Sequence, residues 1–313
     1  MSTSTASDVV RLGSRGSPLA LWQARWVAEA LQHHHPGLQT DIVVIRTAGD
    51  RNRRDPLSRL GGKGIFVQDI EMALLRQEID LAVHSLKDMP TVLPPGLHLG
   101  AIPKRAEGRD VFVARDGRRL TECPGPWRIG TGSLRRQAQL LAWHGALQVQ
   151  DIRGNVDTRL RKMRQGEVDG LVLAAAGLLR LGLQDTITEY LPFDLMLPAV
   201  GQGALAVETR QGDWPDRLLT SIHDDLTACA VTAERAFLAH LSGGCMVPIA
   251  AFGQCQAEVL QLQGLVSTPR GERVLRQEIR GPRGDAAALG RQLAEHMLAR
   301  GARDILASFP PTP

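Results

Sequence analysis

The feature that most constrains the fold is a regular alternation of short apolar runs with amphipathic segments. The runs IVVI at residues 42–45 and LAVHS at residues 81–85 are typical of buried parallel strands. Between them, FVQDIEMALL places Phe66, Ile70 and Leu74 on one stripe of a helix. Strands and helices that alternate in this way predict an α/β fold.

Two pairs of segments indicate an internal repeat. RLGSRGSPLALWQA from Arg11 and RIGTGSLRRQAQL from Arg128 each predict a strand, a turn rich in Ser and Gly, and a helix. RQEIDLAVHS from Arg76 and QGEVDGLVLAA from Gln165 each predict a helix end followed by a strand. The order is the same in both halves, which predicts two similar lobes with a cleft between them. A chance likeness between common α/β units is the alternative.

The repeat also predicts where the chain passes between lobes. Candidate crossings are PKRAEGRD near residues 103–110 and LPAVGQGA near residues 197–204, so the chain returns to the first lobe. A helix containing TACAVTAERAFLAHL follows and leads into a loop with Cys245. We therefore expect domain 1 at 1–104 and 200–223, domain 2 at 105–199, and domain 3 at 224–313.

Composition excludes several classes of protein. A formal net charge of +4 is too mild to imply a polyphosphate partner, and 4% aromatic residues leave few base-stacking platforms. The four cysteines include no CxxC pair and predict no disulfide framework, as expected of a reduced cytoplasmic protein. The polar N-terminus and the absence of a long apolar window predict neither a signal segment nor a membrane span. The triplet His33–His35 before Pro36 favours a solvated helix end over a metal site.

Candidate chemistry follows the apolar runs, because ligands bind at strand ends in α/β sheets. LAVHSLKDMP delivers Ser85, Lys87 and Asp88 at such an end. An aspartate beside a cation stays ionised and can act on cationic or N–H groups. A surface turn with a solvated ion pair explains the same stretch equally well.

A second candidate is GTGSLRRQAQL, which places Thr131 and Ser133 at a helix N-terminus ahead of Arg135 and Arg136. Backbone N–H groups, hydroxyls and guanidiniums together predict an anion site. The stretch is not a dinucleotide fingerprint, because Arg135 stands where the third glycine would be. The GGKG run around Lys63 has the wrong spacing for a P-loop and predicts a mobile loop instead.

More arginines occupy turn-like places, namely Arg15, Arg153, Arg159 and Arg180. Arginine suits bidentate binding of carboxylates, so a ligand with many carboxylates would explain them. RNA would also explain them, but the scarcity of aromatic residues argues against it. Cys245, between two glycines and a proline, is either a small buried hydrophobe or a covalent anchor.

These stretches resemble one family over nearly the whole chain. RGSPLALWQA, GGKGIFVQDIE, DLAVHSLKDMP, TGSLRRQ, RGNVDTRL, AAGLLRLGL, LPAVGQGA, TAERAFL and GGCMVPI occur in the order and at the spacing of the porphobilinogen deaminase (hydroxymethylbilane synthase) family. The C-terminal part resembles the family more loosely.

The resemblance implies three domains, of which the first two are like two-lobed periplasmic solute-binding proteins with a cleft, and the third is a smaller α+β domain. It implies a transferase of heme biosynthesis that joins four porphobilinogen molecules head to tail with loss of ammonia. Hydrolysis then releases the linear tetrapyrrole hydroxymethylbilane. The cofactor implied is a dipyrromethane bound to Cys245 by a thioether, with an acetate and a propionate on each pyrrole. The family suggests a cytoplasmic monomer that hands its product to the next tetrapyrrole enzyme, with no nucleic acid, membrane or metal.

Residue roles carry over from the matching motifs. Asp88, assisted by Lys87, matches the catalytic carboxylate, which we expect to be buried near the pyrrole N–H groups. The residues matching cofactor contacts are Cys245, Arg135, Arg136, Ser133, Thr131, Lys87 and Ser85. Those matching substrate contacts are Arg15, Ser17, Gln23, Arg153, Arg159, Arg180 and Lys63. Two departures are Gly132, where relatives commonly carry serine, and the arginine-rich RNRRD before Gly61.

The main rival hypothesis is a two-lobed binding protein that captures an anion without chemistry, since fold alone does not fix function. That hypothesis gives Cys245 no role. An RNA-binding protein is a weaker rival, which a steep salt dependence of affinity would favour.

Overall fold

The computed structural model describes residues 9–47, 67–123, 125–241 and 247–309. The chain divides into two compact units, and each unit contains two separate stretches of sequence. Unit 1 comprises Met1–Lys104 and Leu205–Asp225, and unit 2 comprises Arg105–Ala204 and Leu226–Pro313. The chain changes unit after Lys104, Ala204 and Asp225. The first change lies within the predicted crossing at 103–110, and the second directly follows the predicted crossing at 197–204.

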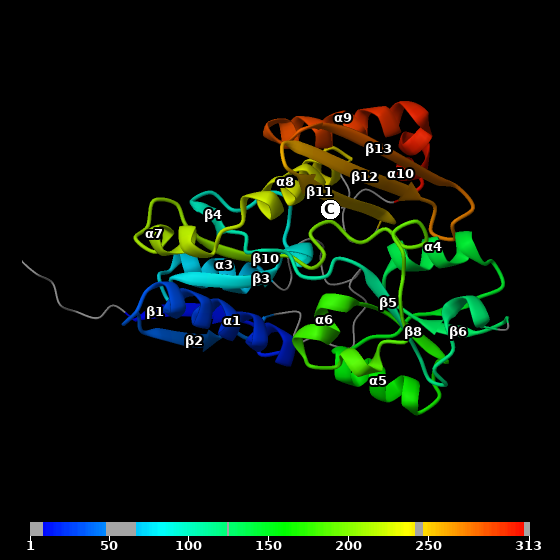
Figure 1. The fold of residues 1–313 in the computed structure, drawn as a ribbon, viewed down its shortest axis with the longest axis horizontal. Coiled ribbons are helices and arrows are strands. Elements are labelled where there is room, and N and C mark those ends of the chain that lie inside the picture. The colour runs from blue at the N-terminus through cyan, green and yellow to red at the C-terminus, as the bar shows by residue number, and fades with distance from the viewer. Residues whose placement is uncertain (1–8, 48–66, 124, 242–246, 310–313) are drawn as a thin grey trace, which may run out of the picture. The chain divides into compact units, whose positions relative to one another are not determined.

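Unit 1 is built on a five-stranded sheet in the order β2-β1-β3-β10-β4 (Figure 1). β1 is parallel to β2 and β3, whereas β10 is antiparallel to β3 and β4. The strands are β1 (Val10–Ser14), β2 (Thr40–Val44), β3 (Leu81–Ser85), β4 (Leu97–Ala101) and β10 (Leu205–Arg210). The helices are α1 (Pro18–His34), α3 (Gln68–Leu75) and α7 (Asp216–Leu219), with 3-10 turns η1 (Leu86–Asp88) and η4 (Thr220–Ile222).

Local sequence explains the helices of unit 1. The Ser17 side chain caps α1 by accepting a hydrogen bond from the backbone N–H of Ala20, and Pro18 occupies the first turn, where its missing N–H costs nothing. Val27 and Leu31 of α1 pack into the core against the sheet. In α3, Ile70 and Leu74 are fully buried, as the apolar stripe predicts, while Phe66 lies outside the described residues.

The two strands predicted in this unit have different environments. β3 lies inside the sheet and is almost wholly buried, which confirms the prediction. The prediction of a buried strand at 42–45 was wrong in burial: β2 pairs only with β1 and is half-buried, with Asp41 and Val44 exposed. An edge strand has one neighbour, so an apolar run there need not be enclosed.

The first sheet of unit 2 repeats this plan in the order β7-β6-β8-β5-β9. β6 is parallel to β7 and β8, and β5 is antiparallel to β8 and β9. The strands are β5 (Asp110–Ala114), β6 (Arg128–Gly130), β7 (Gln148–Gln150), β8 (Gly170–Ala174) and β9 (Glu189–Tyr190). The helices are α4 (Leu134–Trp143), α5 (Val156–Arg164) and α6 (Ala175–Arg180), with 3-10 turns η2 (Leu120–Glu122) and η3 (Gln184–Thr186).

The internal repeat extends to individual side chains. Arg11 at the start of β1 donates to Asp80 from Nη2 at 2.8 Å, and Asp80 directly precedes β3. In unit 2, Arg128 at the start of β6 donates to Asp169 from Nη2 at 2.8 Å, and Asp169 directly precedes β8. The same arginine–aspartate pair joins the same two strands in each sheet, which confirms that the two halves are built alike.

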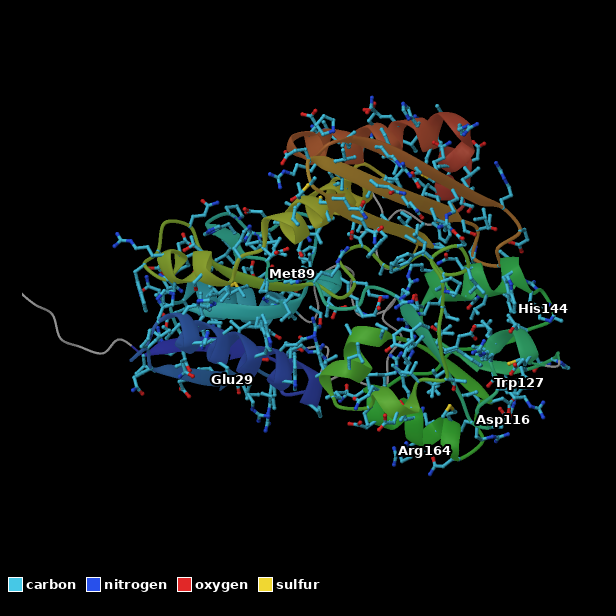
Figure 2. All side chains as sticks on the ribbon, in the orientation of Figure 1. Glu29, Met89, Asp116, Trp127, His144 and Arg164 are labelled. Atoms are coloured by element: carbon cyan, nitrogen blue, oxygen red, sulfur yellow. The ribbon has the colours of Figure 1, made fainter. Side chains whose placement is uncertain are left out.

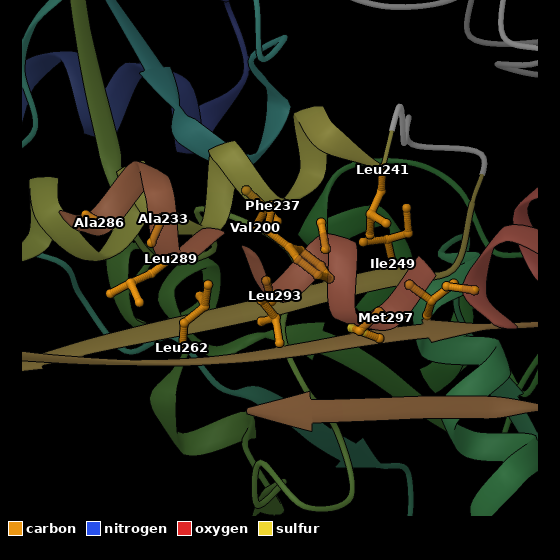
Figure 3. Packing of buried hydrophobic residues seen from close by; sticks show 14 of the residues in the cluster. Val200, Ala233, Phe237, Leu241, Ile249, Leu262, Ala286, Leu289, Leu293 and Met297 are labelled. Atoms are coloured by element: carbon orange, nitrogen blue, oxygen red, sulfur yellow. The ribbon is translucent and has the colours of Figure 1, made fainter. Parts of the chain in front are cut away.

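The rest of unit 2 is an antiparallel sheet, called here the C-terminal sheet, in the order β11-β12-β13. Figure 3 shows its core, where Phe237, Leu262 and Leu293 are buried between the sheet and helices α8 and α9. The predicted helix before the cysteine loop is confirmed as α8. Bounds are α8 (Asp225–His240), β11 (Ile249–Gln256), β12 (Val259–Ser267), β13 (Val274–Pro282), η5 (Arg283–Asp285), α9 (Ala286–Met297), η6 (Leu298–Ala302) and α10 (Arg303–Ala307).

Candidate active site

A pocket in unit 1 gathers one group of the predicted residues. It opens where β1 and β3 end and α1 begins, and its lining includes Arg15, Ser17, Gln23, Ser85 and Asp88. Because β1 and β3 are parallel neighbours, their carboxyl ends meet at one edge of the sheet. The sequence positions 15–23 and 85–88 are therefore brought together by the topology.

Hydrogen bonds fix part of this pocket. Gln23 is 2% exposed and its Nε2 donates to Ser85 Oγ at 2.9 Å, which ties α1 to the end of β3. Met89, labelled in Figure 2, follows the turn η1 and is buried. Lys87 is half-buried in the same turn, but it is not among the residues that line the pocket.

Asp88 corrects one expectation. We expected a buried carboxylate, whereas Asp88 is exposed at the end of η1, beside the pocket that it helps to line. The turn explains the difference: Leu86 is buried with 1% exposure, whereas Asp88, the last residue of η1, is exposed. Asp88 is thus accessible to a ligand that enters the pocket.

The sequence analysis missed a buried cluster of titratable groups in this unit. His84 Nε2 lies 3.2 Å from Glu208 Oε2, and both side chains are almost completely buried. Glu71 of α3 is 5% exposed, and burial, with the charge of Glu208, raises its pKa to about 7. His84 also lines the Asp88 pocket, so this cluster adjoins the candidate site. The sequence did contain a signal: titratable residues occur inside apolar segments that form buried elements. A titratable side chain that is buried must be paired or neutral.

The second group of predicted residues lies in unit 2, at the N-terminus of α4. Ser133 caps the helix, and its side chain accepts from the backbone N–H of Arg136 at 3.5 Å. Thr131 is buried, and its Oγ1 accepts from the backbone N–H of Ser133 at 3.2 Å. These positions follow the end of β6, just as Arg15 and Ser17 follow the end of β1.

Arg135 and Arg136 are buried around a carboxylate that the sequence analysis did not identify. Asp110 Oδ2 lies 2.7 Å from Arg135 Nη1, and Asp110 Oδ1 lies 2.8 Å from Arg136 Nη2. All three side chains are nearly inaccessible to solvent. Burial acts to raise the pKa of Asp110, but the two guanidiniums outweigh it and hold that pKa well below its usual range. We expected two arginines facing a ligand; the structure shows that Asp110 neutralises one of their two charges.

Further hydrogen bonds hold this arrangement in place. Arg135 also donates to the carbonyl of Leu197 at 2.7 Å, and Arg136 donates to the carbonyl of Val172 at 3.1 Å. Gln202 Nε2 donates to Asp110 at 3.0 Å, so the second crossing segment supports the same carboxylate. With two guanidiniums and one carboxylate, the cluster places one net positive charge in the first turn of α4.

Arg159 extends the positive region. Its Nε donates to the carbonyl of Gly154 at 2.8 Å. Burial and the charge of Arg136 lower the pKa of Arg159 to about 10, against the opposing charge of Asp151. Nearby, the exposed Arg153 donates to Asp151 at 2.8 Å. A desolvated guanidinium close to other cations favours the binding of an anion.

Arg180, at the end of α6, is placed differently. Its Nη2 donates to the carbonyl of Gly203 at 2.8 Å, and burial lowers its pKa to about 10. This bond joins α6 to the second crossing segment.

The structure gives Gly132 a packing role. A Cβ at this position would lie 3.1 Å from Asp151 Oδ1 and 3.3 Å from the carbonyl oxygen of Ile152. A serine in this backbone would press against the carboxylate that pairs with Arg153. Lys63, Cys245 and the arginine-rich segment before Gly61 lie outside the described residues.

The fold and the two groups of residues define a class: a multidomain α/β protein with an aspartate-lined pocket in one unit and a cluster of buried arginines in the other. Comparison with known families then gives the assignment. Residues 10–216 match the description "Porphobilinogen deaminase, dipyromethane cofactor binding domain", and residues 228–299 match "Porphobilinogen deaminase, C-terminal domain". The chain belongs to the porphobilinogen deaminase family.

Similar proteins support this assignment. The porphobilinogen deaminase of Syntrophotalea carbinolica is 51% identical over 311 residues, which cover 98% of each chain. That of Pelotomaculum thermopropionicum is 49% identical over 298 residues, covering 95% of this chain and 96% of the relative. A periplasmic aliphatic sulphonate binding protein from Escherichia coli is 13% identical with a TM-score of 0.39, covering 74% of this chain and 70% of that one. That last likeness is too weak to bear on the fold.

Proposed function

We propose that this chain catalyses the hydroxymethylbilane synthase reaction: four porphobilinogen molecules are condensed with loss of ammonia, and the linear tetrapyrrole is released by hydrolysis. The observation that carries this proposal is the buried excess of positive charge at the N-terminus of α4. There, Arg135 and Arg136 share the buried carboxylate of Asp110, and the half-buried Arg159 lies close enough to Arg136 to feel its charge. A substrate that adds two carboxylates at each step requires such a site.

The residues of unit 2 fit the dipyrromethane cofactor of the family. Ser133, Thr131 and the backbone N–H groups at the start of α4 offer hydrogen-bond donors, and the arginine cluster offers the charge that its carboxylates need. We assign Arg135, Arg136, Ser133 and Thr131 to this role, with Ser85 and Lys87 from unit 1 and Cys245 as the covalent attachment. When bound, the cofactor supplies the pyrrole carbon at which the first substrate is joined.

Asp88 is assigned the catalytic role. Its carboxylate, on the edge of the pocket, can accept a hydrogen bond from the pyrrole N–H. It can also stabilise the positive charge that develops as ammonia departs. It can also move the proton that the leaving amine gains and the pyrrole carbon later loses. A substrate that fills the pocket excludes water from Asp88, which strengthens both effects.

The other residues of the pocket are assigned to substrate binding. Arg15 provides positive charge, and Ser17 stands at the N-terminus of α1, where the helix dipole favours anions. Gln23 holds Ser85 in position through its hydrogen bond. Arg153, Arg159, Arg180 and Lys63 are assigned to the incoming substrate and the lengthening product.

We also propose the three-domain division at 1–104 with 200–223, 105–199, and 224–313. The separate hydrophobic core around Phe237 and Leu293 supports the third domain. Among the described residues, no helix combines the length and apolar character that a membrane crossing requires. We further propose a cytoplasmic monomer that passes its product to the next enzyme of tetrapyrrole synthesis.

The test of this function is the variant Asp88→Asn, which keeps the shape of the side chain but removes its charge. We expect kcat for tetrapyrrole formation to fall by about 10²–10⁴-fold, because both charge stabilisation and proton transfer are lost. The matched control is Asp41→Asn, an exposed aspartate on the edge strand of the same unit. Activity of Asp88→Asn within a few fold of the control, in a protein with the same melting temperature, would exclude Asp88 from the chemistry.

A further inference from the structure

Two thiols beside the C-terminal sheet lie in contact. Cys229 lies on α8 and Cys255 lies near the end of β11, and the thiol of Cys255 donates to the sulfur of Cys229 at 2.9 Å. Both cysteines are free and half-buried, so small reagents can reach them. The proposed activity uses neither of these thiols.

The surroundings distinguish the two sulfurs. Burial and the adjacent Cys229 raise the pKa of Cys255 to about 12, so Cys255 remains a thiol at neutral pH. The Cys229 thiol donates to the carbonyl of Arg283 at 3.4 Å. The Arg283 guanidinium is held by Glu258 at 3.0 Å, and the buried Glu234 lies close enough to act on Cys255. Because the Cys255 thiolate is disfavoured, we assign the first attack to Cys229 and the closing step to Cys255.

Cys123 provides an internal contrast. It is buried in the first sheet region of unit 2, where its thiol donates to the carbonyl of Arg119 at 3.3 Å. Burial raises the pKa of Cys123 to about 12. Its contact is a backbone oxygen, with which no covalent bond can form, so among the cysteines within the described residues only Cys229 and Cys255 are placed to join.

We propose that Cys229 and Cys255 form a reversible intrachain disulfide when the protein meets a low-molecular-mass disulfide. The Cys229 thiolate attacks one sulfur of the oxidant, which breaks the oxidant's S–S bond and releases one small thiol. Cys255 then loses its proton to solvent, bonds to the Cys229 sulfur and displaces the second small thiol. The two protein thiols are oxidised and the small disulfide is reduced, so electrons and atoms balance.

The geometry demands little movement. A disulfide requires an S–S distance of about 2.05 Å, so the two sulfurs must approach by less than about 1 Å. The bond would join two positions that are 26 residues apart, and Cys245 lies between them in the sequence. It would tie α8 to β11 and restrict the unfolded chain, so the oxidised protein should unfold at a higher temperature.

In the test, the purified full-length protein is first fully reduced and then treated with oxidised glutathione at neutral pH. Its peptides are then mapped by mass spectrometry. We expect the peptides of Cys229 and Cys255 to become joined, with loss of two hydrogens, and dithiothreitol to separate them. Cys123→Ser is the matched control and should behave like the unchanged chain. Cys255→Ser should instead retain glutathione on Cys229, and its melting temperature should not rise on oxidation.

Three results would overturn the proposal. Separate glutathione adducts on Cys229 and Cys255 in the unchanged chain would show that the pair does not close. A bridge from either cysteine to Cys123 or Cys245 would show that the contact does not select the partner. Absence of any reaction in the folded protein, when the urea-unfolded chain reacts, would show that the pair is protected. None of these results depends on catalytic activity.

Discussion

Arg159 illustrates how a single side chain can carry the charge that the site needs. Its side chain is half-buried, partial burial and the charge of Arg136 lower its pKa, and its described side-chain hydrogen bond goes to a neutral carbonyl. An incoming carboxylate would therefore gain a charge-assisted hydrogen bond at little cost in displaced partners.

We predict that Arg159→His raises KM for porphobilinogen by about 10–100-fold, since losing one such bond costs about 1.5–3 kcal/mol. The variant should also change the distribution of enzyme-bound species seen by native mass spectrometry. Arg164→His, on the same helix but exposed (Figure 2), is the control and should resemble the unchanged chain. Equal KM values for the two variants would remove Arg159 from substrate binding.

The buried Glu71 leads to a prediction of how the stability of the fold depends on pH. Its pKa is raised from 4.5 to about 7, because burial and Glu208 disfavour its charged form more strongly than His84 favours it. The folded state therefore holds a proton that the unfolded chain releases. The stability that this proton confers is complete below pH 4.5 and is lost as pH rises through 7.

The difference between the pKa of Glu71 in the folded and the unfolded chain corresponds to at most about 3 kcal/mol in the free energy of unfolding. Urea unfolding of the unchanged chain between acidic and neutral pH should show this loss, and Glu71→Gln should largely abolish it. Glu29→Gln, at an exposed position of α1 (Figure 2), should leave the pH profile unchanged. A Glu71→Gln profile that runs parallel to that of the unchanged chain would contradict the assignment.

At the scale of elements, local pattern and long-range pairing differ in how well a sequence foretells them. The β3 strand, the α3 stripe and the two strand–turn–helix repeats were predictable, because periodicity, caps and apolar runs are local properties. The exposed position of β2 was not, since burial depends on which strands become neighbours. The return of the chain to unit 1 was predicted, but the antiparallel insertion of β10 between β3 and β4 depends on pairing across more than a hundred residues.

The residues of the candidate site likewise differ in how far the sequence predicts their positions. Thr131, Ser133, Arg15 and Ser85 follow strand ends, so topology alone predicts their positions. Asp110 was missed because its partners, Arg135 and Arg136, come from a helix that is distant in the sequence. An aspartate by itself does not indicate which residue it will pair with after folding. Asp88 was expected to be buried because chemistry at a carboxylate benefits from low polarity, whereas the short turn η1 leaves it exposed.

Both crossing segments are anchored by one buried carboxylate of α8. Glu234 accepts hydrogen bonds from Arg105 at 2.8 and 2.9 Å and from the backbone N–H groups of Gly201 and Gly253 at 2.7 and 2.8 Å. Arg105 and Gly201 belong to the first and second crossings, respectively. The helix that precedes the cysteine loop thus also holds the first two of the places where the chain changes unit.

We predict that Glu234→Gln lowers the free energy of unfolding by about 3–5 kcal/mol. The change leaves Arg105 buried without its counter-charge, and it places an amide NH₂ among groups that are themselves hydrogen-bond donors. Urea unfolding measures this loss. Glu295→Gln, which removes an exposed carboxylate on α9, is the control and should change stability little. A Glu234 variant as stable as this control would show that the buried pair does not anchor the crossings.

On the scale of the whole molecule, two sheets of the same order carry different chemistry at equivalent edges. Both units place hydroxyls and guanidiniums after equivalent strands, but only unit 1 adds an exposed carboxylate, Asp88, at its pocket, whereas unit 2 buries two arginines around Asp110. On the proposed function, one copy of this scaffold carries the site for bond formation and the other carries the site for the anionic cofactor. Membership of the porphobilinogen deaminase family accounts for both, because the reaction lengthens a polyanion one unit at a time.

The most direct measurement is the intact mass of the freshly purified chain and of Cys245→Ser. The account predicts that the unchanged chain exceeds its polypeptide mass by two linked pyrrole units, confined to the peptide that contains Cys245. It also predicts that Cys245→Ser carries no excess mass and forms no tetrapyrrole. A bare polypeptide that is active, together with an active Cys245→Ser variant, would contradict it.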